Sequence, residues 1–290
     1  MNEFDYVAPQ SVSEVVAVLS EHGDRAKLLA GGTDIIVQLR EGLREADMVV
    51  DIKKIDAVTS FKYCDENGLS LGAAVACYNL YEHPQLSKLY GALADSTHII
   101  GGWQIQSRAS VGGNLCNASP AADSIPALIA LNATAVIAGP SGERSVAVED
   151  FCMGPGRNVL ENGEFLVSLQ IPAQCGNCGS AYERFIPRNE MDIAVVGAGS
   201  WVKLADDGTI AEARIGLGAV AATPLVAEAA AASLIGKDPT EENFAAAGEL
   251  AKQIATPISD MRGTDEYRMH LVGVLVKRTL TTAVERAQSS

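Results

Sequence analysis

The amino-acid sequence predicts an α+β protein with about two domains, on the strength of three observations. The chain has 290 residues, of which 48% are hydrophobic and 20% charged, and this composition is typical of a globular protein with a sizeable core. A length near twice ~150 residues favours about two domains. In the second half of the chain, strand patterns come first and helical patterns follow, as in α+β rather than alternating α/β structure.

The first residues predict a helix, a strand and a second helix. Ser11 with Glu14 three positions later has the pattern of a capping box, and apolar residues recur at helical spacing up to Gly23. Residues 27–30 form a short apolar strand, which ends at a Gly-Gly pair before a helical pattern at 33–39. Further strands are predicted at 48–52, 69–75, 133–138 and 165–171, and further helices at 86–100 and 125–131.

A long loop is predicted at 110–123, where the sequence SVGGNLCNASPAAD has no hydrophobic period. Long loops in compact domains are often functional. Residues 172–179 are the best linker candidate. Beyond them the patterns predict strands at 181–185, 193–204 and 209–217, a hairpin turn at 206–208, and helices at 224–235, 239–254 and 265–287. Asp238 is expected to cap the second of these helices, with Pro239 at its first position.

Charge and hydropathy exclude two kinds of partner. The 36 acidic and 22 basic residues give a formal charge of -14, which repels a polyphosphate backbone, so nucleic acid is not an expected partner. No apolar stretch approaches the ~20 residues of a membrane span. The first residues lack a basic segment followed by an apolar one, so we expect no secretion signal and a cytoplasmic location.

Six cysteines are scattered along the chain, at positions 64, 77, 116, 152, 175 and 178, and we expect them to be reduced thiols. A structural zinc or an iron–sulfur cluster needs four ligands, usually from a second close pair, so neither is expected here. Only Cys175 and Cys178 have ligand-like spacing. A thiol-containing turn is the favoured interpretation of this pair, and metal binding is the alternative.

Two glycine pairs have the pattern of phosphate-binding loops, namely Gly31-Gly32 before Thr33-Asp34 and Gly112-Gly113 before Asn114. Glycine lets the backbone come close to a ligand, so that successive N–H groups can point at phosphate oxygens. The first pair also leads into a helix N-terminus, where the helix dipole favours an anion. The two loops together would hold a diphosphate from both sides, although each pair alone is more often a plain turn.

A third glycine motif, Gly197-Ala198-Gly199, has the pattern of the start of a dinucleotide fingerprint. Val202 stands where the last glycine of that fingerprint should be, and the following residues turn back as a hairpin instead of continuing as a helix. The favoured interpretation is therefore structural, with small residues packed tightly in a strand.

Residues for acid–base or nucleophilic catalysis are not evident. The four histidines, His22, His83, His98 and His270, adjoin no serine or cysteine in a nucleophile motif, and zinc-protease and Walker motifs are absent. Asp123 could either cap the following helix or bind the hydroxyl groups of a cofactor. We therefore assign no catalytic residue.

Several short motifs occur in a specific order along essentially the whole chain. They are Ala30 to Asp34, Ser110 to Asn114, Ser119-Pro120 with Asp123, and Arg188 with Asp192 to Ala194. This order resembles the FAD-binding, or medium, subunit of molybdenum hydroxylases. The family includes the flavoproteins of xanthine dehydrogenase, nicotinate dehydrogenase and aerobic carbon monoxide dehydrogenase.

The resemblance implies an FAD-binding fold of the vanillyl-alcohol-oxidase (PCMH) type. Residues 1–174 would form the FAD-binding domain, with lobes at about 1–55 and 56–174, and residues 175–290 would form a C-terminal domain with an antiparallel sheet and helices. One side of the FAD would be lined by Leu28, Leu29, Ala30, Gly31, Gly32, Thr33, Asp34 and Ile35, and the other by Ala109, Ser110, Gly112, Gly113, Asn114 and Asn117.

The resemblance also implies contacts at the two ends of the cofactor. Asp123 matches an acidic residue beside the adenosine, and Leu166 matches a residue that packs on the adenine. Asp192 and Ile193 match the segment that borders the isoalloxazine ring. Arg184 stands where many relatives have lysine, which keeps the charge but changes its geometry from a point to a planar fork.

Differences from some members of the family narrow the expected mode of FAD attachment and the expected branch of the family. Neither glycine loop contains a histidine, and Cys116 is the only thiol near them, so the FAD is expected to be non-covalent. The extra-cluster loop of members that reduce hydroxybenzoyl-CoA is missing. The stretch 114–126, with Gly154-Pro155-Gly156, resembles the xanthine and related purine or heterocycle dehydrogenases more than the carbon monoxide branch.

The function that the resemblance implies is electron transfer within a multi-subunit oxidoreductase. A large partner subunit with a molybdenum cofactor would oxidise the substrate, and a small partner with [2Fe-2S] clusters would pass electrons to FAD on this chain, which would reduce an acceptor such as NAD+. The whole enzyme would act on xanthine or a related purine or N-heterocycle. Alternatives are a nicotinate or carbon monoxide dehydrogenase subunit, a stand-alone flavin oxidase or reductase, a flavin-free scaffold of the same fold, and an α+β protein with plain Gly-Gly turns.

Overall fold

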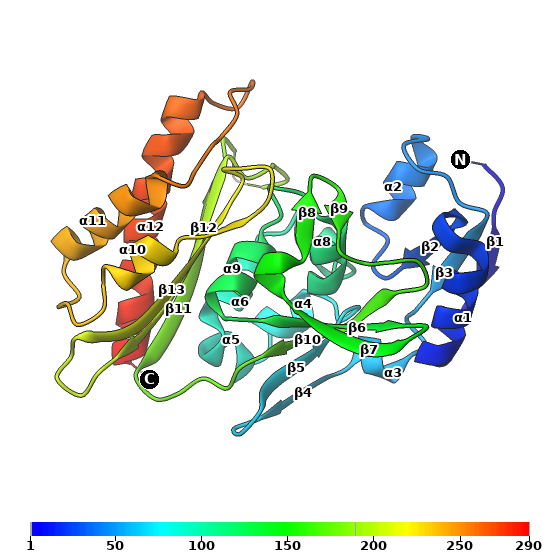
Figure 1. The fold of residues 1–290 in the computed structure, drawn as a ribbon, viewed down its shortest axis with the longest axis horizontal. Helices are drawn as coiled ribbons and strands as arrows, with labels where there is room; N and C mark the ends of the chain where they lie inside the picture. Colours follow the sequence, from blue (N-terminus) through cyan, green and yellow to red (C-terminus); the bar gives the residue numbers. More distant parts are fainter. Residues whose placement is uncertain (1, 189, 290) are drawn as a thin grey trace.

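Three larger β-sheets follow one another along the described residues and lie side by side in space, with a further two-stranded hairpin in the middle part (Figure 1). This computed structural model describes residues 2–188 and 190–289. We call the part up to residue 55 the N-terminal lobe, the part from 56 to 171 the central lobe, and the part from 178 onwards the C-terminal part. The N-terminal lobe and the C-terminal part lie at opposite ends of the molecule, with the central lobe between them.

The N-terminal lobe has a three-stranded parallel sheet in the order β1-β3-β2. Its elements are β1 (Asp5–Val7), α1 (Val12–His22), a 3-10 turn (Gly23–Arg25), β2 (Ala26–Leu29), α2 (Ile35–Arg40) and β3 (Met48–Asp51). The predicted cap of α1 is confirmed, because the Glu14 N–H donates to the Ser11 hydroxyl and the Glu14 carboxylate accepts from the Gln10 N–H. In this order β2 is an edge strand, with one side free to border a cavity.

The central lobe is built on an antiparallel sheet in the order β4-β5-β10-β6-β7. Its strands are β4 (Phe61–Cys64), β5 (Gly68–Gly72), β6 (Thr134–Gly139), β7 (Gly142–Ala147) and β10 (Phe165–Ile171), with β8 (Cys152–Gly154) and β9 (Arg157–Asn158) as a separate hairpin. The helices are α3 (Asp56–Thr59), α4 (Tyr78–Tyr81), α5 (Leu86–Leu89), α6 (Gly91–Thr97), α7 (Trp103–Gln106), α8 (Val111–Asn117) and α9 (Ser124–Ala130), with a 3-10 turn at Val148–Asp150. The central strand β10 is buried along almost its whole length, which explains its continuous apolar sequence.

The predicted long loop at 110–123 is wrong in its first half, because α8 occupies Val111–Asn117. The Ser110 hydroxyl caps this helix by accepting the Gly113 N–H at 3.1 Å. Two glycines disfavour a helix by propensity. At Gly112, however, a Cβ would come within 2.5 Å of the Ala73 carbonyl oxygen, so only glycine lets the helix pack this closely on the sheet. Tertiary packing therefore overrides the local pattern.

The predicted helix at 86–100 is divided into α5 and α6 by Tyr90, which has a non-helical backbone (φ -116, ψ 57). Tyr90 is almost fully buried, and its hydroxyl donates to the Pro172 carbonyl oxygen at 3.1 Å. The break is the consequence of placing this large side chain under the segment that leaves the central lobe.

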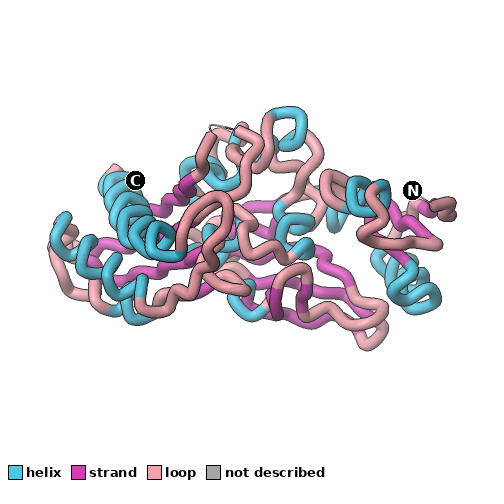
Figure 2. The backbone as a smooth tube through the Cα atoms, turned by 90° about the horizontal axis from the view of Figure 1, so that it is seen from above, coloured by secondary structure: helices cyan, strands magenta, loops and turns pink. Residues whose placement is uncertain are grey.

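The C-terminal part is an antiparallel sheet, β11-β12-β13-β14, with helices on one face (Figure 2). Its elements are β11 (Cys178–Phe185), β12 (Val196–Leu204), β13 (Ile210–Gly218), β14 (Leu225–Val226), α10 (Glu228–Ala232), α11 (Glu241–Lys252) and α12 (Asp265–Gln288). The predicted order of strands and then helices is confirmed, as is the hairpin between β12 and β13.

Three predicted boundaries in this part are wrong. The first helix begins only at Glu228, because the residues before it pair with β13. Thr240, not Asp238, caps α11, since its hydroxyl accepts the Asn243 N–H at 3.3 Å. The strand expected from Ile193 begins at Val196. Each error lies at an element end, where hydrogen bonding decides the boundary.

The motif Gly197-Ala198-Gly199 lies inside strand β12, so the structural interpretation of it is confirmed. A Cβ at Gly199 would lie 2.6 Å from the Pro126 carbonyl oxygen of α9. The glycine is needed for the close approach of the C-terminal sheet to the central lobe.

The cysteines correct one prediction. Cys175 and Cys178 form a disulfide instead of two reduced thiols, while Cys64, Cys77, Cys116 and Cys152 are unpaired. The two paired residues are only three positions apart, and Asn177 between them has a left-handed backbone that closes the turn. No group of three or more potential metal ligands occurs within 2–188 and 190–289. Within the same residues, none of the helices is both long and apolar enough to cross a membrane.

Candidate cofactor-binding site

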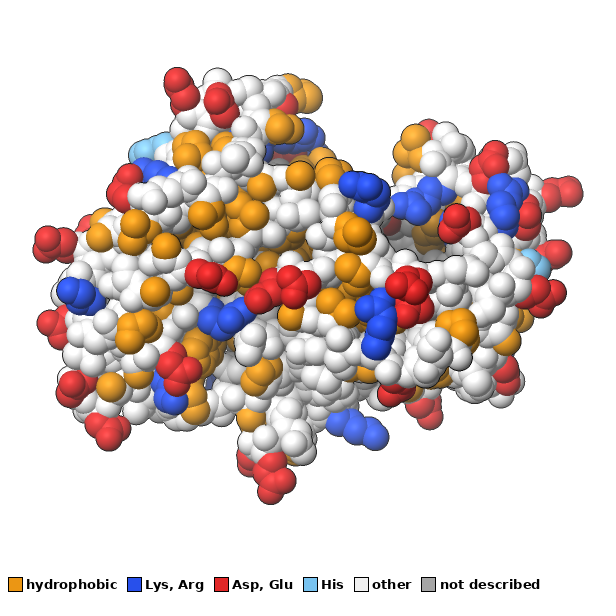
Figure 3. Space-filling view, viewed as in Figure 1, with side chains coloured by type: hydrophobic (Ala, Val, Ile, Leu, Met, Phe, Trp, Pro, Cys, Tyr) orange, Lys and Arg blue, Asp and Glu red, His pale blue; other side chains and the backbone are white. Residues whose placement is uncertain are grey.

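A cavity lies where the N-terminal lobe meets the central lobe, and it is open to solvent at its mouth (Figure 3). It encloses about 1030 Å³ of space between its walls, part of which belongs to the open mouth. Its predicted lining residues are Leu28, Ala30, Gly31, Gly32, Thr33, Asp34, Ile35, Ala109, Ser110, Gly112, Gly113, Asn114, Asn117 and Leu166. Segments about 80 residues apart in the sequence are thus brought to one site.

The two glycine loops pack directly against each other. A Cβ at Gly31 would lie only 2.0 Å from the Arg108 carbonyl oxygen, so any side chain there would push the loops apart. In the other direction, the Arg108 guanidinium donates to the Gly31 carbonyl oxygen at 3.1 Å. The first loop therefore has a fixed position relative to the start of α8, which contains the second glycine pair.

Both loops leave backbone N–H groups without an acceptor. Among the residues that the structure describes, the N–H groups of Gly32, Thr33 and Asp34 donate to no protein atom, and the same is true of Gly112 in the first turn of α8. Buried or partly buried N–H groups normally find a partner. A ligand with several oxygen acceptors, such as a diphosphate, would satisfy both sets at once.

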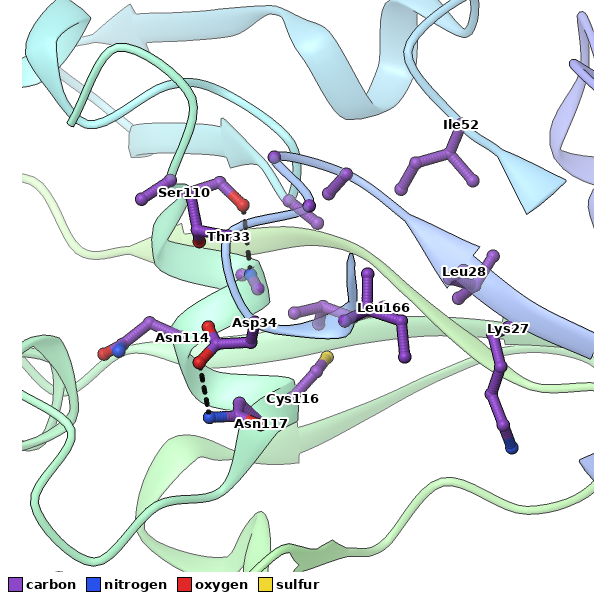
Figure 4. Close-up of a pocket in the computed structure, with 18 of the residues that line it drawn as sticks. Lys27, Leu28, Thr33, Asp34, Ile52, Ser110, Asn114, Cys116, Asn117 and Leu166 are labelled. Atoms are coloured by element: carbon purple, nitrogen blue, oxygen red, sulfur yellow. Dashed lines mark hydrogen bonds between the residues drawn. The ribbon is translucent and has the colours of Figure 1, made fainter. Parts of the chain in front are cut away.

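A side-chain bridge connects the two walls of the cavity (Figure 4). The Asn117 amide nitrogen on α8 donates to the Asp34 carboxylate at 3.3 Å, and its carbonyl oxygen accepts from Gln38 on α2 at 3.1 Å. Although Asp34 reaches solvent through the cavity, burial in the surrounding protein raises its pKa. The bridge holds α2 against α8.

The deeper wall of the cavity is apolar. Leu28 on β2, Ile52 after β3 and Leu166 on β10 line it from the two adjoining sheets. Leu29 does not line the cavity and instead packs in a small cluster with Leu39. The difference follows from the alternation of side chains along a strand, which sends neighbours to opposite faces.

Sequence reasoning missed several lining residues: Lys27, Gln38, Arg44, Ile52, Ala73, Ile100 and Cys116. The first six lie outside the glycine motifs, so only tertiary structure brings them to the cavity. Burial raises the pKa of the Cys116 thiol to about 12, and Cys152 nearby adds to the effect. The thiolate form needed for covalent attachment is therefore scarce at neutral pH.

Asp123 and Arg184 do not line this cavity but meet at the contact between α9 and β11, which we call the junction. The Arg184 guanidinium is 2.6 Å from the Asp123 carboxylate, and the Tyr182 hydroxyl donates to the same carboxylate at 2.9 Å. Asp123 stands at the cap position of α9 but makes no side-chain cap. Burial raises the pKa of Asp123 to about 6, and this outweighs the opposite effects of Arg184 and Tyr182.

The junction borders the cavity through a short segment of chain. Arg184 donates to the Ile99 carbonyl oxygen at 2.8 Å, and the next residue, Ile100, lines the cavity. The Arg184 Nε is buried and has no hydrogen-bond partner among the described residues. This orphaned donor is the one feature by which the junction itself could contact a ligand.

Asp192 and Ile193 lie in the loop between β11 and β12, away from the cavity lining. The Asp192 carboxylate is 3.7 Å from the guanidinium groups of both Arg188 and Arg262. Ile193 is half-exposed. The structure therefore gathers the predicted phosphate and adenine residues at one cavity, and leaves the predicted ring residues outside it.

The residues of the cavity fit an FAD molecule. Gly31 and Gly112 let the backbone of the two loops pack closely, since a Cβ at either would collide with a neighbouring carbonyl oxygen, and N–H donors of these loops lack acceptors among the described residues. An apolar wall next to the loops suits an aromatic ring system. Among the described residues that line the cavity, no acidic, basic or nucleophilic side chain is hydrogen-bonded to a second such group. Asp34 is hydrogen-bonded to the Asn117 amide.

Comparisons with known proteins give the same result. Residues 2–174 match the family model described as the FAD binding domain in molybdopterin dehydrogenase, and residues 180–283 match the CO dehydrogenase flavoprotein C-terminal domain. The carbon monoxide dehydrogenase medium chain of Hydrogenophaga pseudoflava is 31% identical, with 98% of each chain covered. A putative xanthine dehydrogenase FAD-binding subunit of Escherichia coli is 30% identical, with 97% of this chain and 96% of the relative covered.

A solved structure of carbon monoxide dehydrogenase from Hydrogenophaga pseudoflava superimposes with a TM-score of 0.93 at 33% identity and covers 98% of both chains. The α+β fold with an FAD-binding domain and a C-terminal antiparallel sheet is therefore confirmed. The carbon monoxide and xanthine branches match almost equally well, so identity does not separate them. The chain belongs to the family of FAD-binding subunits of molybdenum-containing dehydrogenases, and is a subunit of an oxidoreductase.

Proposed function

We propose that this chain holds FAD in the cavity between its N-terminal and central lobes and transfers electrons within a larger enzyme. The observation that carries the proposal is the pair of glycine loops, which line one cavity with an apolar wall and whose N–H groups include several without an acceptor among the described residues. The FAD-binding domain would be residues 1–174, with lobes at about 1–55 and 56–174, and the C-terminal domain would be residues 175–290.

The protein's own part in the reaction is positioning. Gly31 and Gly112 permit the close packing that aims backbone donors at the diphosphate, and the Asp34–Asn117 bridge keeps the two walls at a constant separation. Bound FAD would accept electrons singly and release them in pairs. The buried Cys116 thiol, with its raised pKa, supports non-covalent binding.

Contacts from the junction and from the neighbouring loop complete the proposal. The Arg184 Nε would donate to the cofactor, and Asp123 would act through Arg184, because both of its oxygens already accept hydrogen bonds. Asp192 and Ile193 would border the isoalloxazine ring once the cofactor extends beyond the cavity. Leu166 would pack on the adenine from β10.

The partners would be a large subunit with a molybdenum cofactor and a small subunit with two [2Fe-2S] clusters, which would deliver electrons one at a time. The acceptor would be NAD+ or a comparable two-electron carrier. Xanthine or a related purine or N-heterocycle is the proposed substrate of the whole enzyme, on the pattern of residues 114–126. A cytoplasmic location belongs to the same proposal, and cell fractionation would test it.

The experiment is to purify the chain with its co-purifying subunits and to record the visible spectrum. We expect flavin absorbance that acid precipitation releases as free FAD, and bleaching of that absorbance when xanthine is added without an acceptor. NADH formation on adding NAD+ would support the acceptor. A complex without flavin would contradict the proposal. Activity of the isolated chain on its own substrate would favour a stand-alone flavin enzyme instead.

A carbon monoxide dehydrogenase subunit is the second candidate. The observation that favours it is the structural likeness to carbon monoxide dehydrogenase from Hydrogenophaga pseudoflava, with a TM-score of 0.93 over 98% of both chains. Bleaching of the flavin by carbon monoxide, with no response to xanthine, would decide for this branch. Bleaching by nicotinate alone would place the chain in a nicotinate dehydrogenase.

A further inference from the structure

Two cations at the cavity have no acidic partner. Lys27 on β2 and Arg44 in the turn that follows α2 both line it. Neither makes an ion pair with any carboxylate in the described part of the chain, whereas Arg25 and Arg40, which do not line the cavity, are each paired with carboxylates. Figure 3 shows Lys and Arg side chains gathered at the rim of the hollow beside the N-terminal lobe.

The positive charges of Lys27 and Arg44 also repel each other. Lys27 is half-buried, and its ammonium group donates to the Asp24 carbonyl oxygen. Burial lowers the pKa of Lys27, and the positive charge of Arg44 lowers it further, against a smaller opposite effect of Asp24. Two like charges near a desolvated surface are unfavourable for the protein alone. An anion between them would relieve the repulsion.

The position of the cations indicates which part of a ligand they would meet. Lys27 directly precedes Leu28, which with Ile52 and Leu166 forms the apolar wall. In Figure 4, Leu166 lies between the glycine-loop residues Thr33 and Asn114 on one side and Lys27 on the other. Lys27 is therefore at the end of the cavity where the apolar wall, not the glycine loops, forms the lining, and Arg44 is close enough for its charge to act on Lys27.

We propose that Lys27 and Arg44 bind the adenylate half of FAD and make the cavity select FAD over FMN. This inference rests on the proposed FAD site. FMN carries a single phosphate group next to its ribityl chain, and that group would be held by the glycine loops without reaching the cations. The diphosphate of FAD extends from the loops towards the apolar wall, so the phosphate next to its adenosine would lie against Lys27 and Arg44.

The test is to titrate the flavin-free full chain with FAD and, separately, with FMN. Binding is measured by the quenching of flavin fluorescence. For Lys27→Met and for Arg44→Met, we expect the Kd for FAD to rise about tenfold at low salt, because each removes a charge-assisted contact. The Kd for FMN should stay the same. Thermal melting of each variant checks that it is folded.

Matched controls separate local contacts from general charge. Arg40→Met lies on the same segment as Arg44 but does not line the cavity, and Lys62→Met removes an exposed lysine on β4. Both should leave the FAD affinity unchanged. At about 0.5 M salt the wild-type protein and the two cavity variants should converge, because mobile ions screen the contacts.

A second readout does not depend on affinity. FAD should protect Lys27 from acetylation, measured by mass spectrometry, while FMN should not. If the wild-type protein binds no FAD, the proposed function fails. If it binds FAD and the cavity variants bind equally well, or if FAD and FMN lose affinity equally, the assignment of Lys27 and Arg44 to the adenylate half is wrong.

Discussion

The cavity and the junction treat their polar groups in opposite ways. At the cavity, backbone N–H groups of both glycine loops lack acceptors, and Lys27 and Arg44 lack acidic partners among the described residues. At the junction, Asp123 accepts hydrogen bonds on both carboxylate oxygens, from Tyr182 and Arg184. The cavity keeps its hydrogen-bonding capacity for a ligand, whereas the junction uses most of its capacity within the protein and leaves the Arg184 Nε without a partner among the described residues.

Glycines and charged residues therefore have two different roles in this molecule, which are ligand binding at the cavity and packing at the contact with the C-terminal part. Gly31 at the cavity and Gly199 on β12, where the C-terminal sheet meets α9, both permit a close backbone contact, of 2.0 Å and 2.6 Å respectively for a hypothetical Cβ. The first contact leaves donors free, and the second joins the C-terminal sheet to α9. We therefore expect changes at the cavity to alter FAD affinity and changes at the junction to alter the free energy of unfolding.

The largest expected effect is at the junction. In Arg184→Met the buried Asp123 carboxylate loses its ion-pair partner, and we expect the free energy of unfolding to fall by about 3–5 kcal/mol at pH 8. The measurement is urea denaturation of the flavin-free protein. Arg278→Met, which breaks an exposed pair with Glu183 on the same strand, should change it by only about 0.5 kcal/mol.

The pH dependence of the same variant sharpens this prediction. The folded pKa of Asp123, about 6, lies above its unfolded value, so its contribution to stability is greatest at low pH and falls as pH rises towards 6. Without Arg184 the pKa of Asp123 in the folded protein is higher still, so the stability of the variant continues to fall above pH 6. The deficit of the variant should therefore be small at pH 5 and large at pH 8. A deficit that is constant with pH would contradict the ion pair.

At the cavity, the largest effect is expected for Gly31→Ala. The added Cβ would collide with a backbone oxygen that cannot move aside alone, so the two loops must separate, and we expect about a hundredfold weaker FAD binding by fluorescence titration. Gly199→Ala should instead lower stability while the folded fraction keeps its FAD affinity. Gly176→Ala, in open space, serves as the neutral control. Equal loss of FAD binding in all three would remove the distinction between the regions.

A smaller effect is expected for the disulfide between the lobes and the C-terminal part. Cys175→Ser opens a very short covalent loop, for which the loss of chain entropy on closure corresponds to about 2 kcal/mol of stability. FAD affinity should not change, because neither cysteine lines the cavity. Urea denaturation with and without a reductant tests this, with Cys64→Ser as the exposed control. Loss of flavin from the Cys175→Ser variant would contradict this prediction and show that the linker affects FAD binding at the cavity.

The smallest effect is expected for Asn117→Ala, which removes the bridge between Asp34 and Gln38. Each hydrogen bond contributes about 1 kcal/mol, so FAD affinity should fall about fivefold, with little change in unfolding. Asn79→Ala removes an amide that makes no side-chain hydrogen bond in the described part of the chain, and it should be neutral. A large loss of stability in Asn117→Ala would show that the bridge supports the fold rather than the cavity.

The fold could be predicted from the sequence where local chemistry decides it. The Ser11 cap of α1, the turn between β12 and β13, and the order of strands and helices after residue 178 follow from capping, turn residues and hydrophobic period. The prediction failed at α8, where packing of Gly112 on the Ala73 backbone outweighs low helix propensity, and at Tyr90, where burial of one aromatic ring interrupts a helix.

The site was predictable in part for the same reason. The glycine pairs are recognisable because free N–H groups and close backbone approach require glycine at fixed positions, and this requirement is local. Lys27, Arg44 and Ile52 had no such signal, since their role depends on which face of β2 and which turn borders the cavity. Asp123 is ambiguous in the sequence, and the structure places its carboxylate against Arg184, which is 61 residues away.

By itself the sequence determined the fold class, the family and the two phosphate-loop motifs, because each depends on residue types at short, fixed spacings. Only the tertiary structure decided that the loops share one cavity, that Lys27 and Arg44 lie beside it without an acidic partner among the described residues, and that the Asp123 charge is enclosed at the junction. Charges and donors acquire their role from what surrounds them, and burial and partner choice are set by packing between segments far apart in the chain.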